Sequence, residues 1–195
     1  MNTKNVTIKI CVTAMFAALI VGGKTVLASI PNVEVVTILV ALCGYCWGLS
    51  VVLPAVFVFI ACDVMFYGFN TWVISYLIHW NVVGVCFWLL SLLKLNHPAL
   101  KAVCATMLAT VITALFGVTT SVVDTCLGFV TGKGFYLYLD DFWRRFCVLY
   151  LNGVVFYVTQ VICNLFLFAV AFVPLERVNT RAKLRFLQQD VVAEE

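Results

Sequence analysis

The sequence of 195 residues is 64% hydrophobic and 11% charged, with a net charge of +3 and a mean hydropathy of +1.10. These values exclude an ordinary soluble domain and indicate a polytopic membrane protein. At about 20 residues per span, the chain has room for about six helices and for no soluble domain of its own. Any energy source must therefore lie in another protein, and no nucleic-acid partner is expected.

The first apolar run, Val6 to Ser29, carries the small residues Ala14, Ala18 and Gly22. Because they are spaced four apart, they lie on one face of a helix. In lipid, a strip of small side chains lets another helix approach closely. The strip predicts either a docking surface for a partner or close packing inside the protein's own bundle, and both readings remain open.

A second helix is expected to open at Pro31, with Glu34 in its first turn, where a carboxylate caps the helix dipole favourably. Residues 35–62 carry no charge, and this run is too long for one ordinary span. We predict two short helices with a reversal at residues 48–50. The alternative is one steeply tilted helix, which leaves five spans and places the chain ends on opposite sides.

The later part of the chain predicts three further spans. They are expected at residues 71–93, 99–123 and 146–173. A longer connection covers residues 124–145, and the last helix is expected to end before Pro174. The predicted domains are thus a transmembrane part, residues 1–175, and a polar cytoplasmic tail, residues 176–195.

Both chain ends are basic, and this sets the predicted topology. The cations are Lys4 and Lys9 at the start and Arg177, Arg181, Lys183 and Arg185 at the end. Because cytoplasmic segments are enriched in Lys and Arg, we expect an even number of crossings and cytoplasmic termini. The predicted fold is all-α, with six transmembrane helices in a plasma membrane.

Two segments combine aromatic and polar residues at the expected outer side. Residues 68–81 read GFNTWVISYLIHWN, and Tyr76, His79 and Trp80 share a helical face there. Residues 132–145 read GKGFYLYLDDFWRR. This second segment is either an interfacial stretch at headgroup depth or a lid that covers a flat ligand, and its length favours the lid.

The histidine, amide and cysteine residues of the predicted spans give weaker indications of a functional site. A single His in a span, such as His79, is more often an interhelical hydrogen-bonding group than a ligand contact. The amides of Asn152, Gln160 and Asn164 are expected to bond across helices. Of the nine cysteines, Cys43 and Cys46 form a CxxC spacing without a second ligand pair, so we assign no metal site.

Four stretches, taken in order, resemble a known family. They read TAMFAALIVGGK, IPNVEVVTILVALCGYCWG, FYGFNTWVISYLIHWN and NGVVFYVTQVICNLFLFAVAFVPL. Together they resemble the S component, the substrate-binding membrane subunit, of the energy-coupling factor (ECF) vitamin importers of prokaryotes, and they look most like its cobalamin-type branch. The likeness covers nearly the whole chain.

The resemblance implies a subunit that binds a vitamin from outside, has no cofactor or enzymatic activity of its own, and docks on a membrane coupling subunit driven by two ATPases. Ala14, Ala18 and Gly22 would form the docking surface. The pocket would draw on the connection from Lys24 to Glu34 and on the two polar segments. The candidate binding residues are Asn32, Asp63, Asn70, Trp72, Tyr76, His79, Trp80, Tyr136, Tyr138, Asp140 and Trp143.

Cobalamin is the leading substrate by resemblance. A folate, a pantothenate-like acid or a queuosine precursor would also suit a lid that carries several aromatic rings and both positive and negative charges. A proton-driven carrier would need an intramembrane carboxylate relay, for which Asp63 is the nearest candidate, and an internal repeat, which the chain lacks. No nucleophile and base come together for an intramembrane enzyme. A non-transport scaffold or assembly protein remains the other class.

Overall fold

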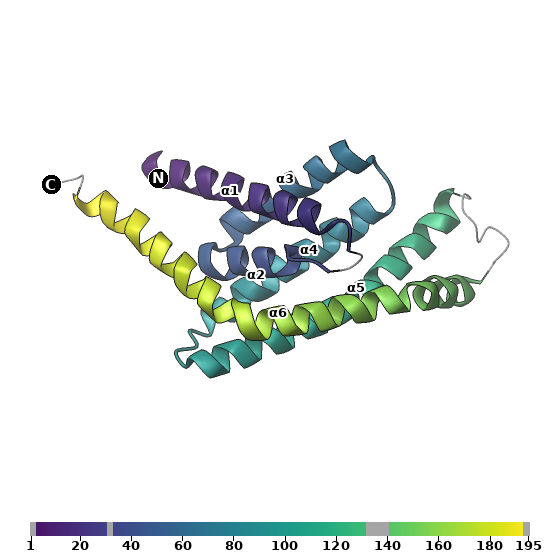
Figure 1. The fold of residues 1–195 in the computed structure, drawn as a ribbon. Coiled ribbons are helices and arrows are strands. Elements are labelled where there is room, and N and C mark those ends of the chain that lie inside the picture. Colours follow the sequence, from purple (N-terminus) through teal and green to yellow (C-terminus); the bar gives the residue numbers. More distant parts are fainter. Residues whose placement is uncertain (1–2, 31–32, 132–140, 193–195) are drawn as a thin grey trace.

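The computed structural model describes residues 3–30, 33–131 and 141–192, with six α-helices and no strand in these ranges (Figure 1). The helices are α1 (Thr3–Leu27), α2 (Val36–Trp47), α3 (Leu49–Tyr67), α4 (Trp72–Leu92), α5 (Pro98–Thr131) and α6 (Phe142–Val192). Five of them are long and apolar enough to cross a membrane, and α2, with 12 residues, is shorter than a usual span. The all-α, multi-pass prediction is therefore confirmed.

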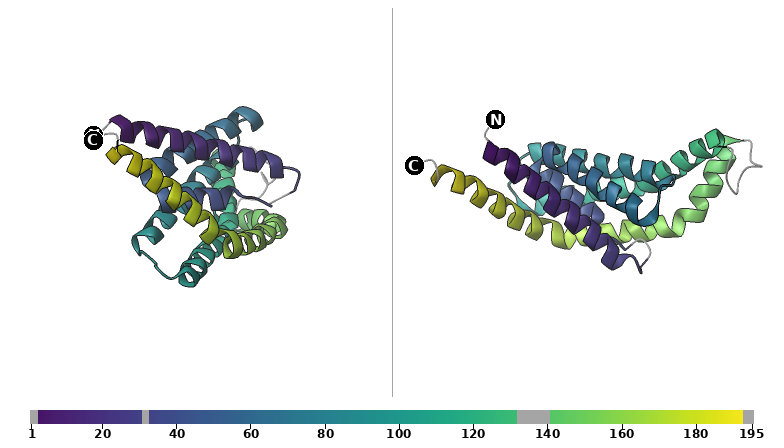
Figure 2. Two further views of the ribbon diagram at one scale, coloured as in Figure 1. Left: turned by 60° about the vertical axis from the view of Figure 1, so that its left-hand side comes forward. Right: turned by 90° about the horizontal axis from the view of Figure 1, so that it is seen from above.

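Successive helices run in alternating directions through the bundle, so the first and last helices begin and end at the same end of the molecule (Figures 1 and 2). Gly48 separates α2 from α3 with φ of 81°, a conformation that glycine adopts without steric cost. The chain reverses at this residue, as predicted. A single tilted helix over residues 35–62 is excluded.

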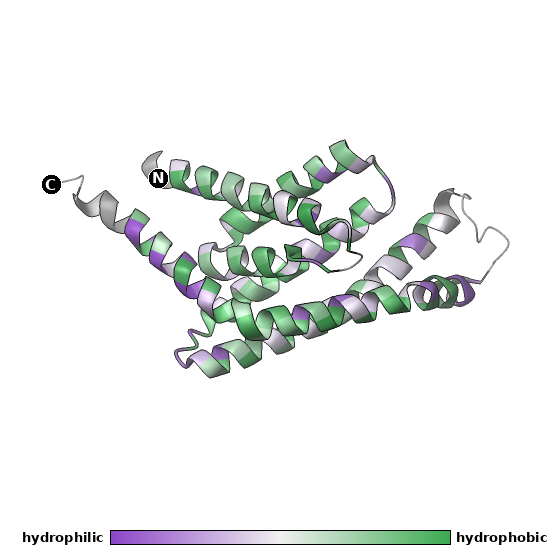
Figure 3. Cartoon of the chain, in the orientation of Figure 1, coloured by the Kyte–Doolittle hydropathy of each residue, from purple (hydrophilic) through white to green (hydrophobic). Residues whose placement is uncertain are grey.

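The core lies between the helices and is built from aromatic and branched side chains. Its largest fully buried members include Phe16, Phe59, Phe87, Phe168 and Phe172. Many other large apolar side chains are exposed, and Figure 3 shows apolar residues along most of the length of the helices. Outward-facing apolar side chains are the expected lipid contacts of a membrane protein.

Three predicted boundaries are wrong. The expected connection at residues 124–145 is helical up to Thr131 and again from Phe142. The apolar runs that set the predicted span ends are shorter than the helices that contain them. The last helix does not stop before Pro174 but continues to Val192, through the predicted polar tail. Figures 1 and 2 show α6 bending between its green and yellow parts. A proline inside a helix removes one backbone hydrogen bond and bends it without necessarily ending it.

The predicted cap at Glu34 is also wrong. Helix α2 begins only at Val36, and its first residues receive no hydrogen bond from a capping side chain. The carboxylate of Glu34 instead accepts hydrogen bonds from other side chains, including two on α6. The carboxylate therefore joins the connection before α2 to α6.

Candidate functional site: an aromatic cavity with one acceptor side

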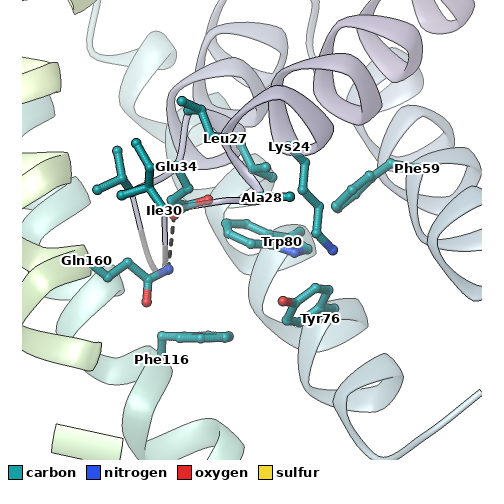
Figure 4. Close-up of a pocket in the computed structure, with 12 residues that line it drawn as sticks. Lys24, Leu27, Ala28, Ile30, Glu34, Phe59, Tyr76, Trp80, Phe116 and Gln160 are labelled. Atoms are coloured by element: carbon teal, nitrogen blue, oxygen red, sulfur yellow. Dashed lines mark hydrogen bonds between the residues drawn. The ribbon is translucent and has the colours of Figure 1, made fainter. Parts of the chain in front are cut away.

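A cavity of about 150 Å³ lies between the helices. Its lining comes from all six helices and from the connection between α1 and α2 (Figure 4). The lining residues are Lys24, Leu27, Ala28, Ile30, Val33, Glu34, Val36, Phe59, Tyr76, Trp80, Phe116 and Gln160. Sequence-distant segments therefore form one site.

The aromatic side of the cavity comes mainly from α4. Tyr76 and Trp80, one helical turn apart, lie with ring centroids 5.8 Å apart. Phe116 of α5 lies 6.2 Å from Trp80, with the two ring planes only 26° apart. Rings in this arrangement offer flat apolar faces, which suit an aromatic or otherwise planar ligand.

Lys24 of α1 lines the cavity, and four aromatic rings surround its ammonium group. Its ammonium pairs with the carboxylate of Asp63 on α3 and lies between 4.8 and 5.6 Å from the ring centroids of four aromatic side chains, those of Phe59, Tyr67, Trp72 and Tyr76. Asp63 is only 2% exposed. A buried carboxylate is tolerated when a cation neutralises it, and the rings stabilise the ammonium further.

The opposite side of the cavity is a hydrogen-bonded cluster. Glu34 Oε1 accepts hydrogen bonds from Thr37 Oγ1 (2.5 Å), Gln160 Nε2 (3.0 Å) and Asn164 Nδ2 (3.2 Å). Asn164, fully buried, also lies within 3.1 Å of Thr113 Oγ1. The prediction that amides of the last span bond across helices is confirmed for Asn164, which bonds Thr37 of α2 and Thr113 of α5. Gln160 bonds Glu34 in the connection between α1 and α2.

Five of the predicted binding residues lie at the cavity or next to it. Tyr76 and Trp80 line the cavity, while Asp63 and Trp72 contact Lys24 next to it. His79 is buried behind the cavity, 4.6 Å from the ring centroids of both Trp80 and Phe116. Its Nε2 has no hydrogen-bond partner among the described residues, so the predicted interhelical hydrogen bond is not found at that atom.

The remaining predicted residues are not brought to this cavity. Asn70 is exposed and accepts a hydrogen bond from the backbone of Thr71. Trp143, with 68% of its surface exposed, packs against Phe142 and Phe146 at the start of α6. Asn32, Tyr136, Tyr138 and Asp140, and with them most of the predicted lid, lie outside the described residues.

Four lining residues lie outside every predicted pocket segment and candidate list: Val36, Phe59, Phe116 and Gln160. Glu34 lies at the end of the predicted connection from Lys24 to Glu34, but it was expected to cap a helix and was not among the individual binding residues. Glu34 and Gln160 are polar residues in apolar surroundings, a signal that marks functional positions in membrane helices. Phe59 and Phe116 carry no such signal, because the sequence contains 16 phenylalanines and nothing local distinguishes these two.

The small residues of α1 lie away from the cavity. Ala14, Ala18 and Gly22 are exposed, and a side chain at Gly22 would meet no atom within 4 Å. The opposite face of α1, with Phe16 and Ile20, is buried in the bundle. The strip therefore does not serve packing inside the described part of the chain, which was one of the two predicted roles.

Comparison of the chain with protein-family models, with curated proteins and with solved structures finds no match.

Proposed function

We propose that this membrane protein is the substrate-binding S component of an ECF-type vitamin importer. In this proposal it captures a water-soluble vitamin or vitamin precursor in the cavity and delivers it inward by docking on a coupling subunit driven by two ATPases. The observation that supports the proposal most is the cavity itself, which combines aromatic faces with a carboxylate, an amide and a lysine inside a helical membrane bundle. Mostly apolar pockets with a few polar groups are typical small-molecule sites.

The placement of the α1 strip fits the same proposal. Ala14, Ala18 and Gly22 face outward, away from the cavity. In lipid, such a strip allows close approach of a second helix. Capture and docking would then use different faces of the bundle, as a subunit that works with a separate motor requires.

The orientation is part of the proposal. Lys101, Arg177, Arg181 and Lys183 gather at the end of the bundle where α5 begins and where α6 passes Pro174. Placing this basic end in the cytoplasm follows the positive-inside rule. With six crossings, both termini are then cytoplasmic in a prokaryotic plasma membrane, and the cavity faces the outer half.

Two observations bear on the substrate: the sequence resemblance and the volume of the cavity. The sequence resemblance puts cobalamin first. A cavity of about 150 Å³ has the size that holds a single benzene-like ring, so cobalamin would enter it only with one ring-bearing group.

The test is binding by the purified, detergent-solubilised chain alone, measured calorimetrically with cobalamin and then with folate, thiamin, riboflavin, pantothenate and biotin. Tight binding of one compound without ATP or any partner supports the proposal. No binding across the panel by a chain that shows a cooperative thermal transition contradicts it and favours a scaffold role.

A further inference from the structure

The hydrogen-bonding groups around the cavity restrict what it can hold, and this inference rests on the proposed function. In the described structure, the three hydrogen bonds to the carboxylate of Glu34 come from uncharged side chains and end on Oε1. Among the described residues, Lys24 pairs with Asp63 and Lys101 with Glu176, and no cation pairs with Glu34. The carboxylate therefore brings negative charge to the cavity without a neutralising cation in the described part of the chain.

Gln160 adds a second acceptor beside this carboxylate. Its Nε2 donates to Glu34 Oε1, and since a carboxylate can only accept, the amide cannot be turned round without losing that bond. The oxygen of the same amide, Gln160 Oε1, therefore points away from the Glu34 carboxylate. The residue is 97% buried, at 3% exposure, and Oε1 has no hydrogen-bond partner in the described structure. A buried acceptor without a partner costs free energy, which a ligand donor would recover.

The other side of the cavity offers donors. Trp80 Nε1 is buried and has no hydrogen-bond partner among the described residues. In Figure 4 the indole nitrogen lies on the side of Lys24 and Tyr76, while Glu34 and Gln160 lie on the opposite side. The cavity thus has an acceptor side and a donor side, with aromatic faces between them.

The aromatic faces set the shape of the ligand. Trp80 and Phe116 have centroids 6.2 Å apart, whereas a flat ring between them needs about 7 Å, two carbon contacts of about 3.5 Å each. A small side-chain adjustment, common on binding, would provide this space. The volume admits one six-membered ring, and larger parts of a ligand must extend out of the cavity.

We infer that the cavity recognises an amino-substituted six-membered heteroaromatic ring of the aminopyrimidine type. The amino group donates to Glu34 and Gln160 Oε1, and a ring or carbonyl acceptor faces Trp80 Nε1. A ligand that carries a carboxylate in place of this amino group is rejected, because its negative charge would meet that of Glu34 in an apolar environment. The inference keeps the S-component role but departs from the sequence resemblance on the substrate: it places cobalamin, and likewise pantothenate and biotin, outside the recognised class.

Two matched pairs of compounds test this on the unmodified protein. Thiamin and oxythiamin differ by an amino group exchanged for an oxo group, as do pterin and lumazine. We expect one amino compound to bind and its oxo partner to bind about 100-fold more weakly, since the exchange leaves buried acceptors facing an acceptor. Isothermal titration of the detergent-solubilised chain measures both.

Variants then assign the preference to the acceptor side. Glu34→Gln and Gln160→Leu should each reduce the amino/oxo preference about tenfold or more. Thr159→Val is the matched control, because this neighbour of Gln160 on α6 bonds only its own helix, to Val155 O at 2.9 Å, and should keep the full preference. A variant without a cooperative thermal transition is replaced by Glu34→Asp, which keeps the charge and should keep part of the preference.

The outcomes separate this inference from the proposed function. Equal binding of amino and oxo partners, or binding of cobalamin, pantothenate or biotin with no binding of either amino compound, overturns the inference and leaves the S-component proposal standing. No binding of any compound by the folded chain overturns both. An amino preference that survives in Glu34→Gln and Gln160→Leu alike overturns the assignment to these two residues.

Discussion

Lys24 of α1 and Asp63 of α3 form an ion pair inside the helical bundle, joining residues that lie 39 positions apart in the chain. Asp63 is almost fully buried, and the ammonium of Lys24 is surrounded by four aromatic rings. The pair therefore fixes the end of α1 next to the cavity. Removal of either partner leaves an uncompensated charge in apolar surroundings.

The first prediction concerns this ion pair. Asp63→Asn and Lys24→Met should each destabilise the protein by about 3 kcal/mol. This value is the lower end of the range for breaking a buried ion pair, and we choose it because 24% of the Lys24 side chain is exposed to solvent. The double variant should lose clearly less than the sum of the two. Thermal unfolding in detergent, with equal protein concentrations, measures the cycle. Strictly additive losses would show that the two charges do not interact.

The second prediction separates the cavity from the start of α6. Tyr76→Ala should weaken ligand binding about 100-fold, because it removes an aromatic wall of the cavity worth about 2–3 kcal/mol. Trp143→Ala should leave affinity within about twofold, since this exposed side chain packs only on its neighbours in α6. Calorimetric titration of both variants decides. Loss of binding in Trp143→Ala alone would move the site to the connection before α6.

The third prediction concerns the outward strip of α1. Under the proposed function, Ala14→Trp combined with Ala18→Trp should abolish uptake in cells that supply the proposed coupling subunit and ATPases. The purified chain should still bind its ligand, because the strip is exposed and away from the cavity. The matched control is Val111→Trp with Leu115→Trp on α5, which are exposed at the same spacing and should retain uptake. Equal uptake in both double variants would remove the strip's docking role.

The fourth prediction tests a close backbone contact between α2 and α4. A Cβ atom on Gly44 of α2 would lie 2.4 Å from the backbone oxygen of Gly84 on α4. Gly44→Ala should therefore cost about 1–3 kcal/mol, since the two backbones must move apart. Gly22→Ala is the control, because its Cβ would meet nothing within 4 Å. An unchanged melting temperature for Gly44→Ala would mean that α2 and α4 separate easily.

Part of the candidate site was predictable from local signals. Tyr76 and Trp80 were identified because polar aromatic residues are concentrated on one helical face, and both line the cavity. Trp143 carried the same kind of signal in a different segment, yet it does not reach the cavity. An aromatic residue in a polar stretch indicates an interface or a site, and residue type alone does not separate the two.

The sequence by itself determined the all-helical membrane class and the reversal at Gly48, because hydropathy and glycine conformation are local properties. Only the tertiary structure decided what Glu34 does. The residue looks like a helix cap in sequence, but Gln160, 126 positions away, holds its carboxylate at the cavity. The same holds for Ala14 and Ala18, whose exposure depends on how α1 packs. Contacts between distant residues follow from the packing of whole helices, and no local pattern records them.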